Sequence, residues 1–214
     1  MDKFEKERER MVTRQIASRG VTDQAVLDAM WVVPREVFVP KAYRDYAYDD
    51  APLPIPDNQT ISQPYVVAYM IAMLELKSTD RVLEIGTGSG YAAAILSRIV
   101  SEVYTVERHR RLADYARERL AEVGYENVHV LHDDGTHGWP EHAPYDGIIV
   151  AAGGPSIPVT LQKQLAVGGR LIMPVGRRRH HQNLVLLTRV DEDVFTDEKL
   201  APVAFVPLIG DEGW

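Results

Sequence analysis

The strongest constraint on the fold is an alternation of short β-type runs and helical patterns in the middle of the 214-residue chain. Apolar and β-branched runs predict strands at residues 81–85, 103–106, 128–131 and 145–151, and helical patterns at 91–99 and 110–123 separate the first three. Strands joined through helices pair in parallel, and the helices pack on the faces of the sheet. We therefore predict an α/β fold: a doubly wound, mostly parallel, Rossmann-like sheet with helices on both faces.

The pattern changes toward the C-terminus. After a short helix at 161–165, β-type runs are expected at 170–175, 183–190 and 200–206. Because no helical pattern separates the last two runs, we predict an antiparallel edge hairpin at the C-terminus.

Residues 1–78 form a helical and then irregular extension in this interpretation. Helices are expected at 4–18, 23–33 and 64–76. Thr22 is the expected N-cap of the second helix, and Pro64 opens the third, which is apolar nearly all round and should be buried. The segment 40–58 contains four prolines and is expected to be ordered but irregular, as long functional loops are.

Composition excludes several classes of function. The net charge of −7 and the pI near 5.5 argue against a nucleic-acid partner, because phosphate binding needs a basic face. Zero cysteines exclude a disulfide framework, a thiolate zinc site and a cysteine nucleophile. The first ten residues are a mixed-charge run unlike a signal peptide, and no apolar stretch approaches about 20 residues, so we expect a cytoplasmic protein without a membrane partner.

A glycine loop follows the first predicted strand of the core. Gly86, Gly88 and Gly90 lie between that strand and the helix expected to begin at Tyr91. Glycines allow the backbone to turn tightly and approach a ligand, and a helix N-terminus offers free N–H groups to an anion. A dinucleotide fingerprint needs glycine at its first, third and sixth positions, but the sixth position here is Tyr91. This spacing favours S-adenosylmethionine over NAD, with a purely structural turn as the alternative.

Acidic residues follow the next two predicted strands. Glu107 ends the second strand about 20 residues after the glycine loop, where a carboxylate meets a ribose diol in doubly wound folds. Asp133-Asp134-Gly135 comes after the third strand, and a carboxylate there could accept a hydrogen bond from an adenine amine, although Asp-Asp-Gly is equally a common turn. Open α/β sheets bind ligands at the carboxyl ends of their strands, so these residues are expected to share one cofactor site.

Motifs spread along nearly the whole chain carry a family resemblance. The most specific is Gln59-Thr60-Ile61-Ser62-Gln63-Pro64-Tyr65. The others are Met11-Val12, Arg19-Gly20-Val21, Val33-Pro34-Arg35, Phe38-Val39-Pro40, Ala47-Tyr48, Pro52-Leu53-Pro54-Ile55, the run from Val82 to Gly90, Pro158, Leu161, Gln164-Leu165, Gly168-Gly169-Arg170-Leu171, Pro174-Val175-Gly176 and Phe205-Val206-Pro207-Leu208. The chain resembles the protein-L-isoaspartate (D-aspartate) O-methyltransferases, a class I S-adenosylmethionine-dependent family.

The resemblance implies a reaction. A methyl group would pass from S-adenosylmethionine, which becomes S-adenosylhomocysteine, to the free α-carboxylate of an isoaspartyl residue in an aged protein or peptide. The ester would then close to a succinimide that reopens partly as normal aspartate. Because such a carboxylate is ionised at pH 7, no general base is needed, and catalysis reduces to alignment and replacement of water by fixed dipoles.

The resemblance also implies site residues. Ser62 matches the active-site serine of the family and is expected to donate a hydrogen bond to the substrate carboxylate, with Thr60 in support. Capping propensity alone would instead place Ser62 at the start of the following helix. The residues expected to bind the cofactor are Glu84, Gly86, Thr87, Gly88, Ser89, Gly90, Glu107, Asp134 and Gly135. Asp133 stands where the family usually has glycine, which leaves its role open.

These inferences give one methyltransferase domain over residues 1–214. Residues 1–78 would be the substrate-side extension and 79–214 the cofactor-binding core, and we expect a monomer. Metal binding by His129, His132, His137 and His142 is disfavoured, because positions three apart on a strand point to opposite faces. The basic run Arg177 to His181 is expected to be a solvated turn.

Rival functions remain open at this point. They are an NAD-dependent oxidoreductase, a non-catalytic binding domain and a methyltransferase with another acceptor.

Overall fold

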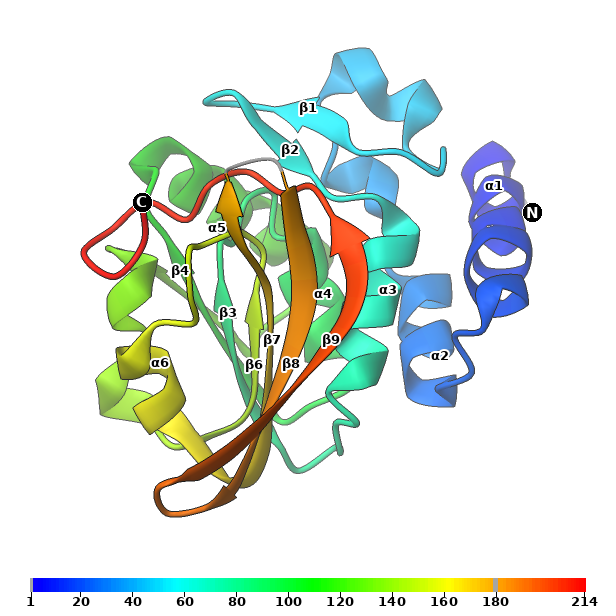
Figure 1. Ribbon diagram of the computed structural model, residues 1–214. Helices are drawn as coiled ribbons and strands as arrows, with labels where there is room; N and C mark the ends of the chain where they lie inside the picture. Colours follow the sequence, from blue (N-terminus) through cyan, green and yellow to red (C-terminus); the bar gives the residue numbers. More distant parts are fainter. Residues whose placement is uncertain (1, 179–180) are drawn as a thin grey trace.

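A seven-stranded sheet forms the middle layer of the protein (Figure 1). The computed structural model describes residues 2–178 and 181–214. In spatial order the strands are β5 (Val128–His132), β4 (Glu102–Glu107), β3 (Arg81–Ile85), β6 (Tyr145–Val150), β7 (Leu165–Arg178), β8 (His181–Asp191) and β9 (Val194–Val203). Pairing is parallel from β5 to β7 and antiparallel from β7 to β9. The predicted, mostly parallel sheet is confirmed.

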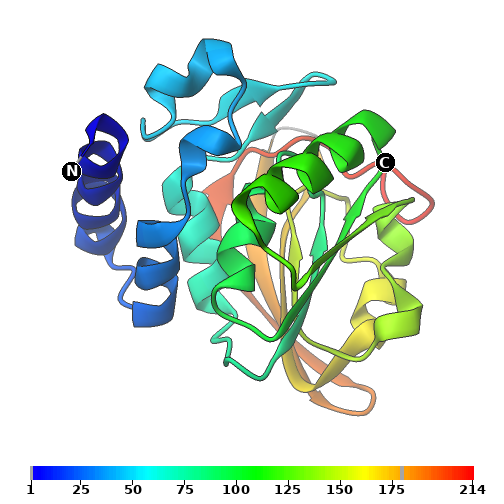
Figure 2. The same ribbon diagram turned by 180° about the vertical axis from the view of Figure 1, so that it is seen from behind.

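Helices cover both faces of the sheet (Figures 1 and 2). One face packs against α3 (Pro64–Met73), α4 (Tyr91–Ser97) and α5 (Arg110–Val123), and the other against α6 (Val159–Gln164). Neighbouring residues of β3 enter different cores: Val82 packs in the cluster with α3 to α5, and Leu83 packs with Leu161 of α6. This alternation, which follows from the two-residue period of a strand, confirms the doubly wound arrangement.

The N-terminal helices pack beside α3, outside the sheet (Figure 1). They are α1 (Lys3–Arg10), two irregular helical turns (Met11–Ile16 and Ala17–Arg19) and α2 (Gln24–Val32). The predicted cap of α2 was wrong by one residue, because the Asp23 carboxylate, not Thr22, accepts from Val26 N at 3.2 Å. Helix α3 ends at Met73, three residues early, and Glu75 then takes a left-handed φ of 52°.

The segment 40–58 is more regular than predicted. It contains a 3-10 helix, Lys41–Tyr46, and the first strand of a hairpin formed by β1 (Leu53–Ile55) and β2 (Gln59–Ile61). Asp57 and Asn58 make the turn with φ of 58° and 57°, which aspartate and asparagine tolerate better than most residues. The hairpin places the Gln59–Ile61 segment above the sheet edge, beside the end of β9 (Figure 1).

The C-terminal hairpin is confirmed, but its last strand was placed wrongly. Strand β9 covers 194–203 and not 200–206. Charged residues at 197–199 hide its first half from a pattern based on apolar residues, although charge is typical of an edge strand. The chain then leaves the sheet as a tail, residues 204–214, in which Pro207 pairs with Gly153. Among the described residues, no helix has both the length and the apolarity to cross a bilayer.

Candidate active site

The loop between β3 and α4 brings bare backbone to the carboxyl edge of the sheet. Gly86, Gly88 and Gly90 all have positive φ, at 93°, 55° and 88°. At Gly90 a Cβ would also lie 3.3 Å from Ala116 Cβ of α5. A side chain there would be both strained and crowded, so the turn requires the glycine. The N–H groups of Gly86 and Gly90 donate to Val106 O and Thr87 O, both at 2.8 Å, so the loop offers a ligand close backbone approach.

Glu107, the last residue of β4, is bonded to this loop. Its Oε2 accepts from Gly88 N at 2.9 Å and its Oε1 accepts from His109 N at 2.9 Å. The residue is buried, yet it lines the cavity above the loop. Each carboxylate oxygen has a second lone pair, so Glu107 can still accept two hydroxyl donors from a ligand.

Glu84 lies buried in β3 beneath the loop. Its Oε2 accepts from Thr105 Oγ1 at 2.6 Å, and that hydroxyl lies 2.6 Å from Thr87 Oγ1. Burial raises the pKa of Glu84, the Thr105 hydrogen bond lowers it, and the charge of Glu107 raises it. Together these effects give a pKa of about 8. Glu84 is therefore largely protonated at neutral pH.

Ser62 lies in the short link between β2 and α3. Gln63 occupies the N-cap position of α3, and no side chain caps this helix, so the capping role for Ser62 is excluded. The Ser62 carbonyl accepts from Arg35 Nη2 at 2.8 Å. Its hydroxyl makes no hydrogen bond within residues 2–178 and 181–214 and is free to meet a ligand.

Two adjoining cavities meet at Ser62. The first, about 920 Å³, extends over the glycine loop, Glu84 and Glu107. The second, about 1220 Å³, lies between the start of α3 and residues 202–207. Thr60, Ser62, Ala151, Val206 and Pro207 line both. Because these residues are shared, a ligand in one cavity could meet a ligand in the other at this boundary.

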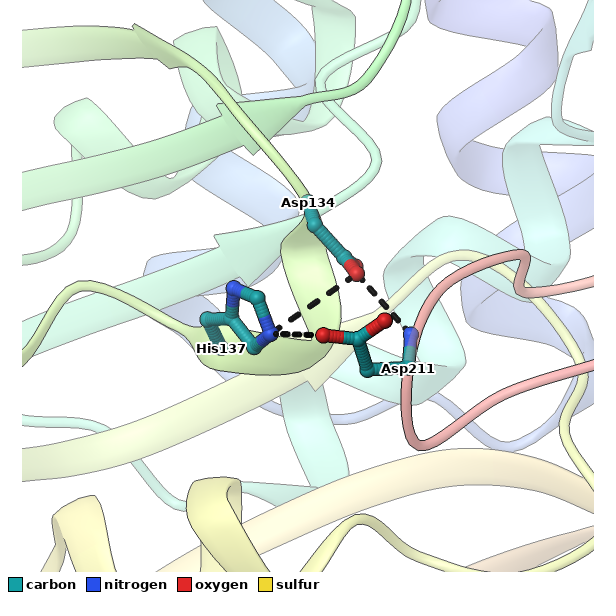
Figure 3. A group of neighbouring side chains, drawn as sticks. All are labelled: Asp134, His137 and Asp211. Atoms are coloured by element: carbon teal, nitrogen blue, oxygen red, sulfur yellow. Dashed lines mark hydrogen bonds and ion pairs between the residues drawn. The ribbon is translucent and has the colours of Figure 1, made fainter.

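Asp134 is not among the residues that line the first cavity. It lies next to His137 and Asp211 (Figure 3). Its Oδ1 accepts from Thr136 N at 2.8 Å, and its Oδ2 accepts from Asp211 N at 2.9 Å. Burial acts to raise the pKa of Asp134, but the hydrogen bonds from Thr136 and Asp211 lower it overall. Asp134 thus holds the C-terminal tail, and its neighbour Gly135 lines the cavity.

Among the described residues, the four histidines considered as metal ligands do not gather into one possible metal site. His129 Nε2 is 2.7 Å from Glu102 Oε2, and the His129 and His142 rings stack on Tyr104. His137 Nε2 lies 2.9 Å from Asp211 Oδ2 and 3.9 Å from Asp134 Oδ2 (Figure 3). The hydrogen bond to Asp211 raises the pKa of His137. Asp134, His137 and Asp211 could form a metal-binding group, but His137 and Asp211 are exposed and bond to each other. In the basic run from Arg177 to His181, the first two residues end β7 and the last begins β8, while 179–180 lie outside the described residues.

The cavity collects most of the sequence-predicted residues. It is lined by Thr60, Ser62, Glu84, Gly86, Thr87, Gly88, Ser89, Glu107 and Gly135, and not by Gly90, Asp133 or Asp134. Sequence reasoning missed Tyr91, Ala151 and the tail residues 206–209 as lining residues. Ala151 could have been found, because it is the last residue of a predicted strand. The tail has no comparable local signal, since the pairing of Pro207 with Gly153 is long-range.

Comparison with known proteins agrees with this geometry. The model of the family "Protein-L-isoaspartate(D-aspartate) O-methyltransferase" matches residues 6–213. A protein-L-isoaspartate O-methyltransferase 2 from Pelobacter propionicus is 59% identical over 207 residues, covering 97% of this chain and 92% of that one. A protein-L-isoaspartate O-methyltransferase from Pelotomaculum thermopropionicum is 55% identical over 208 residues, covering 97% and 90%.

Solved structures are similar over the same extent. One protein-L-isoaspartate O-methyltransferase superposes with a TM-score of 0.88 at 32% identity, covering 96% of this chain and 67% of that one. A second, from Plasmodium falciparum and in complex with S-adenosyl-L-homocysteine, has a TM-score of 0.80 at 23% identity and coverage of 98% and 99%. At that identity the second likeness concerns the fold alone.

Proposed function

The chain belongs to the protein-L-isoaspartate(D-aspartate) O-methyltransferase family, and from this premise we propose which of its residues carry out the transfer. The protein is an S-adenosylmethionine-dependent methyltransferase. It methylates the free α-carboxylate of L-isoaspartyl residues in proteins and peptides, and the ester closes to a succinimide that starts repair. S-adenosylmethionine supplies a methyl group on a sulfonium sulfur and leaves as S-adenosylhomocysteine.

The first cavity is the proposed cofactor site. Its residues fit a nucleoside: the glycine loop offers close backbone approach, and Glu107 keeps free lone pairs for the two hydroxyls of a ribose. The cavity also offers apolar side chains against which the adenine base could pack, because Ile85, Val106 and Leu208 line it. Gly135 lets the third strand-end loop approach closely, since a Cβ there would lie 2.5 Å from Ile85 Cγ2.

The second cavity is the proposed acceptor site. The observation that carries this proposal is that Ser62 and Thr60 line both cavities, so a carboxylate held at Ser62 faces the cofactor side. The Ser62 hydroxyl, which has no partner among the described residues, would donate to the acceptor carboxylate, and Thr60 would support it.

The chemistry asks for position more than for proton transfer. An isoaspartyl α-carboxylate is ionised at neutral pH, so the site needs no base to create the nucleophile. Ser62 would instead donate to one carboxylate oxygen, replace part of its water shell, and so hold the other oxygen about 3–3.5 Å from the methyl carbon that it attacks. That second oxygen stays free for the new bond.

Two peptides that differ only in one aspartyl linkage, normal or isoaspartyl, test the acceptor. Purified protein with methyl-labelled S-adenosylmethionine should place base-labile label on the isoaspartyl peptide alone. Label on neither peptide, with the cofactor still bound, would overturn the acceptor assignment.

Ser62→Ala tests the residue assignment. Loss of a hydrogen bond to a charged group, about 1.5–3 kcal/mol, should lower kcat/KM roughly 10- to 150-fold with little change in cofactor affinity. Ser18→Ala is the matched control, because the exposed Ser18 hydroxyl, in the helical turn Ala17–Arg19, donates to Arg14 O away from both cavities. Equal kcat/KM for the two variants would contradict the role of Ser62.

We propose further that residues 1–78 act as the substrate-side extension and 79–214 as the cofactor-binding core of one domain. The extension supplies Thr60 and Ser62 and the core supplies the glycine loop, which supports this division. We also propose a cytoplasmic monomer without nucleic-acid or membrane partners, and the net charge of −7 favours polypeptide over nucleic-acid acceptors. Light scattering on the purified protein tests the monomer.

A further inference from the structure

Arg35 is buried where the extension meets the cofactor loop. It begins the short 3-10 helix Arg35–Val37 and is 0% exposed. Its Nε donates to Ala47 O at 2.7 Å and its Nη2 donates to Ser62 O at 2.8 Å. The guanidinium carbon lies 4.6 Å from the centre of the Tyr91 ring. One side chain therefore contacts three segments that are distant in sequence.

The charge of Arg35 is costly to bury and has no carboxylate partner. No ion pair to it occurs among the described residues, and Nη1 is buried without a hydrogen bond. Burial lowers the pKa of Arg35. An apolar residue of similar volume would fill this space without that penalty. The planar guanidinium, by contrast, holds two carbonyls in fixed directions while it stacks on a ring, which lysine cannot do.

The contacts of Arg35 reach both halves of the site. Ser62 belongs to the proposed acceptor side, and its carbonyl is the atom that Arg35 holds. Tyr91 is the first residue of α4, directly after the glycine loop, and lines the first cavity. The Tyr91 ring is itself fixed, since it is 1% exposed, packs 5.9 Å from Phe38 and donates from its hydroxyl to Met30 Sδ at 3.7 Å.

We propose that Arg35 is a positioning residue for methyl transfer. It bonds to Ser62 and stacks on Tyr91, and so holds Ser62 at a fixed distance from the glycine loop. It touches neither cavity and acts only through these two neighbours. Displacements of about 1 Å in positioning residues can change rates roughly 100-fold, so a fixed distance between the two halves matters to the reaction. This inference rests on the proposed role of Ser62.

The test compares Arg35→Lys and Arg35→Met with a matched control, Arg189→Lys. Arg189 also donates to carbonyls of two segments, Leu165 O and Glu192 O, and its guanidinium carbon lies 5.7 Å from the Phe195 ring. It lies on β8 and lines neither cavity. For each variant we would measure Tm, the Kd for S-adenosylmethionine by calorimetry, and kcat and KM for an isoaspartyl peptide.

Both Arg35 variants should lower kcat about 10- to 100-fold, with KM for the peptide and Kd for the cofactor changed less than about threefold. Arg35→Lys should lower kcat nearly as much as Arg35→Met, because lysine keeps the charge but cannot make both hydrogen bonds in the same fixed geometry. Arg189→Lys should lower Tm without lowering kcat. Should Arg35→Met not fold, Tyr91→Leu removes the ring that Arg35 stacks on, together with its contacts to Phe38 and Met30, and should also lower kcat more than it weakens cofactor binding.

Wild-type kcat in Arg35→Lys with a lowered Tm would reduce Arg35 to a purely structural role and overturn the proposal. So would a loss of kcat matched by an equal loss of cofactor affinity. If the wild type does not methylate the isoaspartyl peptide, the proposed function fails by itself. The crystal structure of Arg35→Lys then decides separately, since an unmoved Ser62 carbonyl relative to Tyr91 would refute the positioning role.

Discussion

Replacing Glu107 by glutamine should weaken cofactor binding strongly while leaving the fold in place. The Glu107 carboxylate accepts from Gly88 N and His109 N, one bond to each oxygen. Glutamine keeps one acceptor oxygen and puts an NH₂ group in place of the other, so one of the two ribose hydroxyls proposed to donate to Glu107 loses its charged acceptor. A hydrogen bond to a charged group contributes about 1.5–3 kcal/mol. The Kd for S-adenosylmethionine should therefore rise roughly 10- to 150-fold.

Calorimetric titration with S-adenosylmethionine and with S-adenosylhomocysteine measures this effect directly. Glu102→Gln is the matched control, because Glu102 is the first residue of the same strand and pairs with His129 at the exposed opposite end. An exposed pair contributes about 0–1 kcal/mol, so this variant should keep wild-type affinity. Unchanged affinity in Glu107→Gln would refute the reasoning, and it would mean that the carboxylate serves only the backbone of the loop.

Three other perturbations test the surroundings of the site. The pKa of Glu84 is about 8 in the folded protein, against an ordinary value of 4.5. Between these pH values the unfolded chain releases the Glu84 proton and the folded protein keeps it, so the free energy of unfolding of the wild type falls as pH rises. The Tm advantage of Glu84→Gln should accordingly grow from pH 4.5 to 8 and then level off; a constant difference would contradict the raised pKa. Gly135→Ala places a Cβ 2.5 Å from Ile85 Cγ2 and should lower the free energy of unfolding by about 1–3 kcal/mol in a denaturant titration. Asp211→Ala removes the carboxylate whose hydrogen bond raises the pKa of His137 and should bring that pKa back toward 6.5, as measured by NMR of the ring; an unchanged pKa would contradict this cause.

The parallel core could be predicted from sequence because its signals are local. Strands 81–85 and 103–106 were located within a residue, since each is a short apolar run between polar residues. Helix 110–123 was located to the residue by its amphipathic stripe. Where charge masks the β pattern, as at 197–199 in β9, the prediction failed, because an edge strand has one polar face and an unpaired side.

The residues of the candidate site also differ in whether local sequence signals could locate them. The glycine loop and Glu107 could be located from sequence, because strand ends and their following loops meet at one edge of a parallel sheet. The place of Asp134 could not, because its carboxylate bonds to Asp211 N at the other end of the chain. Nothing near residue 134 in sequence indicates that a tail from residues 204–214 will lie there. A cofactor contact and a tail anchor therefore look alike in sequence.

The departure from the dinucleotide fingerprint has a structural consequence for the acceptor side. In that fingerprint the third glycine lets the helix pack closely. Here Gly90 takes this role one residue earlier, with its Cα facing Ala116 and Leu120 of α5. The sixth position is thereby released for Tyr91, whose side chain reaches the extension and meets Arg35. The same shift that favours S-adenosylmethionine over NAD thus also joins the cofactor loop to the segment that carries Ser62.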